Sequence, residues 1–333
     1  MRKYWKTGCA MLLACALLAG CKGAAQEPEA TPTPQQQVEP TPVQSAVDPL
    51  NGSSTVSAYK PLAVMIDNSE AARPQSGLQA ADVVYECQVE GGMSRLMLIL
   101  NSNVPEKVGP VRSARKYYAT LAAGFDAIYA HFGAAQGGGV LDVYKYIESE
   151  KPFKIRIDGL GNDHGLTYRD SARKAPHNAY IKANQAVELY DYTPQVHAFQ
   201  FDVGFTPSGG RAHKVETGLA NASYSYDEVS GLYLRSQGGK AHKDAITGEQ
   251  VKVKNLIIQY AAYTYPEGGQ LAEVIGSGKC QVAINGQYME GTWSKAGLKA
   301  PTVFKDAQGN EITLQPGNTW IHVVPDTKSA KFE

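Results

Sequence analysis

The segment Leu18-Ala19-Gly20-Cys21 constrains the fold of this chain most, because it decides which residues take part in the folded protein. Basic residues within the first six positions precede an apolar run over residues 9–18, which is too short to span a bilayer. Small residues then lead directly to a cysteine, an order typical of a bacterial lipobox. We expect residues 1–20 to leave as a signal peptide and Cys21 to be lipidated. The alternative is an ordinary secretory signal with a cysteine at this position by chance.

Lipidation of Cys21 would make the membrane a partner of the protein, since several acyl chains form a lasting anchor. Residues 21–57 are rich in Pro, Gln, Thr and Glu and poor in large apolar side chains, so they predict a disordered tether. We therefore expect the folded part to be lipid-anchored at the extracytoplasmic face of the cell membrane.

The charge balance and the positions of the cysteines argue against some classes of function. The chain has 32 basic and 32 acidic residues, interspersed rather than in blocks, which argues against a sequence-independent nucleic-acid binder. No later apolar stretch is long enough to cross a membrane. Alternation over residues 83–89 places Cys87 on an apolar face, so we expect a small buried side chain rather than a Cys87–Cys280 disulfide. No cofactor is predicted.

Residues 58–202 predict an α/β or α+β domain with a mixed sheet. Strands are expected over 62–66, 82–89, 95–100 and 126–131, and helices over 110–123, 140–148 and 182–189. Residues 203–222 have the composition of a linker between domains. Residues 223–333 show short strands, turns and no helical period, which predicts a smaller β-rich C-terminal domain.

Several stretches carry a family resemblance. They are PLAVMIDN, RPQSGLQAADVVYE, VEGGMSR, VGPVRSARKYY, FDAIYAHFG and RKAPHNAY, followed by YDEVSGLYLRSQGGKAH, GEQVKVKNLIIQY, IGSGK, GTWSKAGLKAPTVF and PGNTWIHVVP. In this order they resemble the YerB-like lipoproteins of Gram-positive bacteria, from Pro61 to Pro325. The resemblance implies a membrane-anchored pair of N- and C-terminal domains of unknown function, and it brings no biochemical activity with it.

The first candidate site is the segment 109–115. If Pro110 opens a helix, Arg112 and Arg115 lie in its first two turns and oppose the helix dipole. Arginines at a position where the helix dipole disfavours positive charge suggest a role in binding a phosphate or carboxylate. Ser113 lies beside them in the sequence, and Arg95 would provide a third guanidinium group. The alternative is internal pairing of these arginines with carboxylates such as Asp67, Glu86 and Glu90.

The second candidate site is a glycine-rich loop. His131 ends an expected strand, and Gly137 and Gly138 lead into an expected helix, an arrangement typical of ligand sites in open α/β sheets. The loop lacks the spacing of a P-loop or a dinucleotide fingerprint. Its glycines and His131 are equally explained by a tight turn and a buried structural histidine.

The third candidate site is the loop before residue 179, where Pro176 holds His177 and Asn178 outside a continuous helix. His177 or His131 would suit general acid–base catalysis near neutral pH. Asn178 would bind a ligand or cap a helix. No zinc-binding spacing occurs, so no metal is predicted.

Three functions remain open from the sequence. The favoured one is a surface lipoprotein that binds an anionic envelope ligand, such as a wall glycan, a phosphate-containing polymer or a nucleotide. The second is an envelope hydrolase or transferase that uses His131 or His177. The third is a structural or protein-partner role with internally paired arginines. We expect Arg95, Arg112, Arg115, His131 and His177 to line one cleft at the carboxyl ends of the strands.

Overall fold

The strands of the N-terminal half follow apolar runs that are buried on both faces. Every residue of β1 (Leu62–Asp67) is buried, and β3 (Ser94–Leu100) is buried except at Arg95. Continuous burial of this kind requires cover on both sides of a sheet. The computed structural model describes residues 47–54, 58–136, 138–266 and 269–333.

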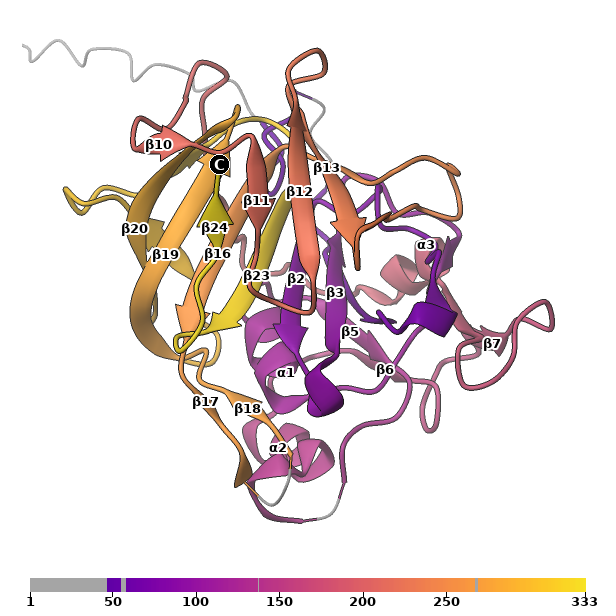
Figure 1. Cartoon of the computed structure of the whole chain (residues 1–333). Helices are drawn as coiled ribbons and strands as arrows, with labels where there is room; N and C mark the ends of the chain where they lie inside the picture. Colours follow the sequence, from indigo (N-terminus) through magenta and orange to yellow (C-terminus); the bar gives the residue numbers. More distant parts are fainter. Residues whose placement is uncertain (1–46, 55–57, 137, 267–268) are drawn as a thin grey trace, which may run out of the picture. The chain divides into compact units, whose positions relative to one another are not determined.

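The central element is an 11-stranded mixed sheet (Figure 1). In sheet order its strands are β10 (Gly210–Arg211), β20 (Gln287–Lys295), β19 (Gly276–Ile284), β16 (Asn255–Ala261), β23 (Thr319–Pro325), β2 (Val83–Gln88), β3, β1, β5 (Ile128–His131) and β6 (Arg156–Asp158), and β21 (Val303–Lys305) pairs with β20. The hairpin β2–β3 is antiparallel, whereas β1, β5 and β6 run parallel to one another.

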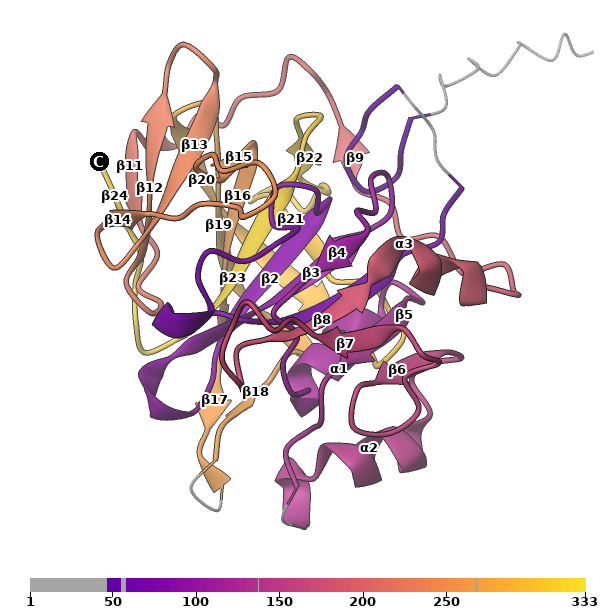
Figure 2. The same cartoon turned by 90° about the vertical axis from the view of Figure 1, so that its right-hand side faces the viewer.

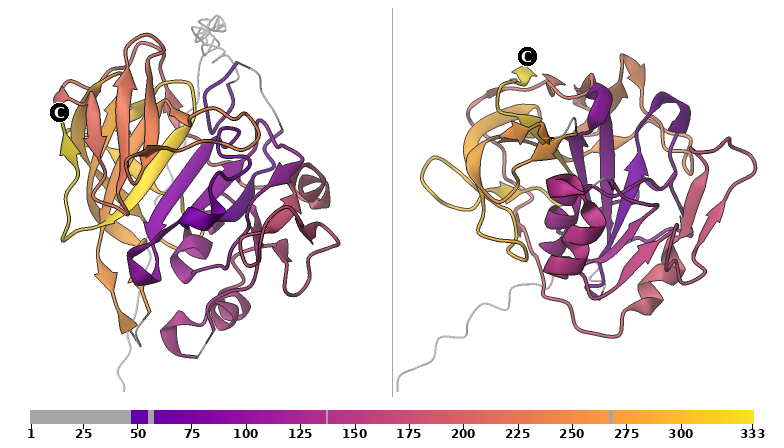
Figure 3. Two further views of the ribbon diagram at one scale, coloured as in Figure 1. Left: turned by 45° about the vertical axis from the view of Figure 1, so that its right-hand side comes forward. Right: turned by 90° about the horizontal axis from the view of Figure 1, so that it is seen from below.

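The sheet joins the two halves of the chain. Strand β23, near the C-terminus, lies between β16 and β2 and pairs in parallel with both, and Figure 3 shows it in yellow beside the purple strand β2. Residues 45–333 accordingly form one compact unit. The expected linker over 203–222 contributes β10 to the central sheet and β11 (Lys214–Glu216) to a second sheet, so it does not separate two independent bodies.

Different layers cover the two faces of the central sheet. The helix α1 (Lys116–Ala123) packs on one face with Tyr85, Met97 and Ile321 (Figure 3). A 6-stranded sheet covers the other face with Tyr224 and Tyr233. Its strands are β14 (Lys240–Ala241), β13 (Leu232–Gln237), β12 (Ala222–Asp227), β11, β24 (Lys331–Phe332) and β15 (Lys252–Val253).

Smaller elements surround these layers, and Figure 2 shows several of them. The strands form one small sheet of β4 (Lys107–Val108), β8 (Ala179–Lys182) and β7 (Thr167–Arg169), and two pairs, β17 (Tyr263–Thr264) with β18 (Leu271–Ala272) and β9 (Gln200–Phe201) with β22 (Thr313–Leu314). The helices are α2 (Val143–Glu150) and α3 (Ala183–Ala186). The 3-10 turns are Glu70–Ala72, Glu90–Gly92, Gly139–Leu141 and Val187–Leu189. The predicted fold class is confirmed, because the sheet is mixed and α-helices occur only before residue 190 within the described ranges.

The expected helix over 110–123 is wrong in its first half. Residues 110–115 lie outside any helix, Arg115 has β-region backbone angles, and α1 begins only at Lys116. The reason is tertiary, because the backbone of Arg112 bonds to the two flanking strands, with its N–H on Met65 O at 2.9 Å and its C=O on Phe132 N at 3.0 Å. Sheet hydrogen bonds outweigh the helix-start preference of Pro110 here.

The expected tether to residue 57 is too long. Residues 47–54 lie on the folded unit, with Leu50 fully buried in the core beside α1. The carboxylate of Asp48 accepts hydrogen bonds from Leu50 N at 2.9 Å and from Asn101 Nδ2 at 3.3 Å. A single apolar residue within a polar, turn-forming sequence gave too weak a pattern to predict this contact.

Cys87 and Cys280 are both free and buried, as expected for Cys87. Burial raises the pKa of each thiol above its usual value, so neither is a reactive thiolate. Among the residues that the structure describes, no helix is long and apolar enough to cross a membrane.

Candidate functional site

The candidate site lies where three parallel strands end. Asp67, His131 and Asp158 are the last residues of β1, β5 and β6. Arg95, the second residue of the antiparallel strand β3, pairs in register with Asp67. Since side chains on one face recur every second residue, these four side chains share the face that α1 covers. Strand ends of parallel sheets are the usual location of binding sites in such folds.

The segment 111–114 occupies this edge because β1 and β5 separate there. The two strands pair only over Leu62–Val64, and the segment then bonds to both of them. Ile66 forms a bridge with Val111, and Ala114 forms one with Ala134. The segment therefore carries Arg112 and Ser113 between the carboxyl ends of β1 and β5.

Asp67 contacts two partly exposed side chains, Arg112 and His177. Its Oδ2 lies 3.0 Å from Arg112 Nε and 2.8 Å from His177 Nδ1, while its Oδ1 accepts the N–H of Ser69 at 2.9 Å. Burial acts to raise the pKa of Asp67, but the hydrogen bonds from Ser69 and His177 and the charge of Arg112 hold it below its usual value. The carboxylate is therefore ionised at neutral pH.

The contact with Asp67 leaves other atoms of both partners unengaged. Because Nδ1 of His177 contacts the carboxylate, Nε2 is the ring nitrogen left for another partner. Neither this Nε2 nor the terminal nitrogens of Arg112 has a hydrogen bond within the described part of the chain. The Arg112 and His177 side chains are 29% and 22% exposed, so an external ligand would be able to reach them.

Arg95 is partly buried behind this pair. Its Nη1 donates to the carbonyl of Ser113 at 2.7 Å, and within the described ranges it forms no ion pair. Burial and the neighbouring charge of Arg115 lower the pKa of Arg95 to about 10, so the guanidinium stays charged at neutral pH. A partly buried charge without a carboxylate is costly, which makes Arg95 unusual for a structural arginine.

Arg115 is paired internally with a carboxylate, as the alternative interpretation of the sequence predicted. Its Nε and Nη2 bind the carboxylate of Glu90 at 2.9 and 2.7 Å, and its Nη1 donates to Ala114 O at 2.9 Å. Because this bidentate pair occupies the guanidinium, Arg115 has little left to offer a ligand. The expectation that Arg115 opposes a helix dipole from within the first two turns is also wrong, because Arg115 precedes the helix.

His131 is brought to the same edge but is fully buried. Its Nδ1 lies 2.8 Å from Gly133 O and 3.7 Å from Asp158 Oδ1, and its Nε2 has no partner among the described atoms. Burial lowers its pKa, so the ring is neutral at pH 7. Because the ring is fully buried, an external ligand does not reach it, and we leave His131 out of the proposed site.

The remaining predicted residues do not join the cluster. Asn178 holds its own loop together, accepting from Arg169 Nη1 at 2.7 Å and donating to Asp170 O at 3.3 Å, and it precedes strand β8 rather than capping a helix. Gly138 has a φ of 80° and donates to Asp142 Oδ2 at 3.3 Å, which fits a turn. Gly137 and Cys21 lie outside the described residues.

Two carboxylates organise this edge, and sequence reasoning gave neither of them a central role. Asp67 was named only as a possible partner for an arginine, and Asp158 was not considered. An acidic residue that ends a buried parallel strand is the signal that would have found both, since Asp67 follows LAVMI and Asp158 follows RI. The described residues contain no cluster of three side chains suited to hold a metal ion.

Comparisons with known proteins identify the proteins to which the chain is similar. Residues 50–195 match the description "Protein of unknown function (DUF3048) N-terminal domain", and residues 213–321 match the DUF3048 C-terminal domain. The chain is 32% identical to "Putative lipoprotein YerB" of Bacillus subtilis over 99% of its own length and 98% of that protein. The crystal structure of YerB from Bacillus subtilis superimposes with a TM-score of 0.75 at 30% identity, covering 86% of this chain and 99% of that one.

These matches agree with the boundaries and the burial described above. The first matched residue, Leu50, is fully buried, and the two matched segments flank the connection over residues 196–212. The crystallised relative shares the fold over nearly its whole length. The chain therefore belongs to the DUF3048 family of YerB-like lipoproteins.

Proposed function

We propose that this lipoprotein binds an anionic ligand of the cell envelope through Arg95, Arg112 and His177. The observation that carries the proposal is the charge balance at the carboxyl end of β1. One carboxylate, Asp67, binds both Arg112 and His177, and Arg95 behind them has no carboxylate of its own. The site therefore holds an excess of positive charge that a phosphate or carboxylate would neutralise.

The accessible atoms fit such a ligand. The terminal nitrogens of Arg112 present two donors in one plane, the geometry that matches a phosphate or carboxylate group. The hydroxyl of Ser113 forms no hydrogen bond within the described residues and lies 3.8 Å from the position that a Cβ on Gly133 would take. Ser113 would add a neutral donor to the same anion.

The ligand is proposed to come from the envelope because of the expected anchor. A lipid on Cys21 would hold the folded unit at the extracytoplasmic face, where wall polymers carry phosphate and carboxylate groups. Replacing Cys21 with serine should move the protein from the membrane fraction to the soluble fraction. A Cys21→Ser protein that still pellets with membranes after its signal has been cleaved would refute the anchor.

Calorimetric titration of the full-length protein in detergent tests the binding site. The probes are inorganic diphosphate and glycerol 3-phosphate, with N-acetylglucosamine as the neutral comparison. We expect both phosphates to bind and Arg112→Gln to weaken them by about tenfold or more, the effect of losing a charged hydrogen bond. Arg211→Gln, at an exposed arginine far along the chain, is the matched control and should bind as the wild type does. Equal affinity in both variants would refute the site.

A second function is favoured by one observation, the Asp67–His177 contact of 2.8 Å. A carboxylate on Nδ1 orients a histidine and leaves Nε2 as a base, the arrangement of many acid–base enzymes. If the site hydrolyses p-nitrophenyl phosphate to p-nitrophenol and phosphate, His177→Gln should abolish turnover while diphosphate still binds. Wild-type protein that binds diphosphate without any turnover would leave only the binding function.

A further inference from the structure

A second cavity lies far from this site, where the connection between the two family segments meets the C-terminal half. It measures about 210 Å³ and lies beside the parallel pair of β9 and β22. That volume exceeds the roughly 30 Å³ of one liquid water but lies below the roughly 300 Å³ of the smallest drug-sized pockets. The cavity therefore suits a molecule of about one ring.

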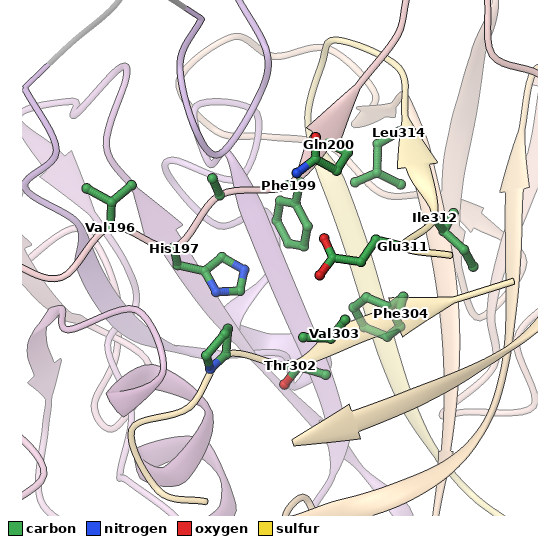
Figure 4. Close-up of a pocket in the computed structure, with 12 residues that line it drawn as sticks. Val196, His197, Phe199, Gln200, Thr302, Val303, Phe304, Glu311, Ile312 and Leu314 are labelled. Atoms are coloured by element: carbon green, nitrogen blue, oxygen red, sulfur yellow. The ribbon is translucent and has the colours of Figure 1, made fainter. Parts of the chain in front are cut away.

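The walls of the cavity are mostly apolar. Figure 4 shows Phe199 on one side and Phe304 with Ile312 on the other, with Thr302 below them. Such walls favour a ligand with a hydrophobic body.

His197 gives the cavity a polar inner end. The residue is only 5% exposed, and neither ring nitrogen has a hydrogen-bond partner among the described atoms. Its ring stacks at a tilt on Phe125, with centroids 4.5 Å apart, and meets Phe199 edge-on at 4.9 Å. Burial and the charge of Lys295 lower the pKa of His197 to about 4, so the ring is neutral at pH 7. Buried polar atoms without a partner are rare, which makes this end of the cavity unusual.

Glu311 is the charged group at the opposite end. Its carboxylate points across the cavity toward Phe199 and His197 (Figure 4). The side chain forms no ion pair within the described ranges, and no lysine or arginine lines this cavity there. A carboxylate beside aromatic faces attracts a cation, and an ammonium group interacts with both.

We propose that this cavity binds a small primary amine with an apolar body, its ammonium group on Glu311 and its ring between Phe199 and Phe304. The neutral imidazole of His197 then contacts the buried end of the ligand. This site is independent of the anion site, since it shares none of its residues and selects the opposite charge.

Titration calorimetry with benzylamine, benzyl alcohol and benzoate tests this proposal on the full-length protein in detergent. We expect benzylamine to bind at least tenfold more tightly than the neutral and anionic analogues. Glu311→Gln should weaken benzylamine about tenfold and leave benzyl alcohol unchanged. Glu148→Gln, at an exposed carboxylate on α2, is the control and should bind benzylamine as the wild type does.

A second variant locates the ligand. Val303→Trp fills the space between the walls and should abolish binding of benzylamine, with a melting curve to verify the fold. If Val303→Trp does not fold, the Glu311→Gln variant still tests the proposal, because Glu311 is exposed and its side chain makes no contact that folding needs. Equal binding of the three probes, no binding of benzylamine, or an unchanged affinity in Glu311→Gln would each overturn the proposal.

Discussion

The charged residues of this protein occur in two different settings. At the candidate anion site they are partly exposed and incompletely paired, whereas between the two sheets they are fully buried and fully paired. Arg235 and Glu86 are both 0% exposed and form an ion pair of 2.8 Å. Arg235 also donates to Tyr224 Oη at 2.6 Å and to His242 Nδ1 at 2.9 Å. Although burial opposes the charge, Glu86 and Tyr224 hold the pKa of Arg235 above its usual value.

The buried pair predicts a large effect from a small change. Glu86→Gln removes the only carboxylate in contact with Arg235 among the described residues and leaves a buried guanidinium uncompensated. We expect a loss of about 3–5 kcal/mol in the free energy of unfolding, measured by urea denaturation. Glu148→Gln on the surface is the control and should change stability by less than about 0.5 kcal/mol. A loss below 1 kcal/mol in Glu86→Gln would show that the network does not hold the layers together.

Sequence reasoning worked best for the strands with continuous apolar runs. Strands β1, β2 and β3 were expected within about one residue of where they occur, because burial on both faces gives a strong local signal. The helix start at Pro110 was wrong because the backbone of the segment 111–114 pairs with strands distant in sequence. Residues 47–54 were assigned to the tether because their contacts are made by one leucine and several turn residues.

The candidate site was predicted only in part, because the sequence pattern indicates where strands end but not which side chains contact one another. Arg95, Arg112 and His177 were expected at one strand edge. In the structure Arg95 pairs in register with Asp67, and Asp67 contacts Arg112 and His177, while their role as a binding site stays a prediction. The pairing of Arg115 with Glu90 and the burial of His131 were expected only as alternatives, and the sequence did not decide in their favour. Both facts depend on side-chain partners far apart in sequence, which periodicity does not encode.

At the scale of elements, Gly109 positions the segment that carries Arg112 and Ser113. Its φ is 151°, and a Cβ there would meet the carbonyl oxygen of Ala179 at 2.8 Å. Gly109→Ala should therefore shift this segment and cost about 1–3 kcal/mol of stability, measured by thermal melting. Gly297→Ala is the matched control, since a Cβ there meets nothing within 4 Å. Equal melting temperatures for the two variants would show that the segment tolerates displacement.

At the scale of the whole molecule, buried neutral histidines make stability depend on pH. Burial lowers the pKa of His131, His197 and His242, and for His242 the charge of Arg235 acts in the same direction. In the unfolded chain each ring returns to a pKa of about 6.5 and binds a proton more readily than in the fold. Stability should therefore fall as pH decreases below about 6.5, by up to roughly 1.4 kcal/mol per pH unit for each ring.

Urea denaturation between pH 7.5 and 5 measures this slope. His197→Phe should reduce it by the share of one ring, because His197 with a pKa of about 4 stays neutral in the fold over this range. Stability that does not change over this interval would contradict the buried neutral state of these histidines.

The shared sheet also limits how the two family segments behave. Because β23 lies between β16 and β2, the N-terminal segment completes its sheet only with a strand from near the C-terminus. The candidate anion site, at the end of β1 and the start of β3, is thus part of the same folded body as the second sheet. Ligand binding at Arg112 would stabilise the whole unit rather than one half of it.

Thermal melting of wild-type protein and of Arg95→Met, with and without inorganic diphosphate, tests the central claim most directly. If Arg95 is present to bind an anion, replacing it removes a costly charge along with one hydrogen bond to Ser113, so the ligand-free protein should lose no more than about 1 kcal/mol. Diphosphate should raise the melting temperature of the wild type and leave that of Arg95→Met unchanged. A loss of about 3–5 kcal/mol in ligand-free Arg95→Met, with no effect of diphosphate on the wild type, would show that Arg95 is an internal strut and would contradict the account.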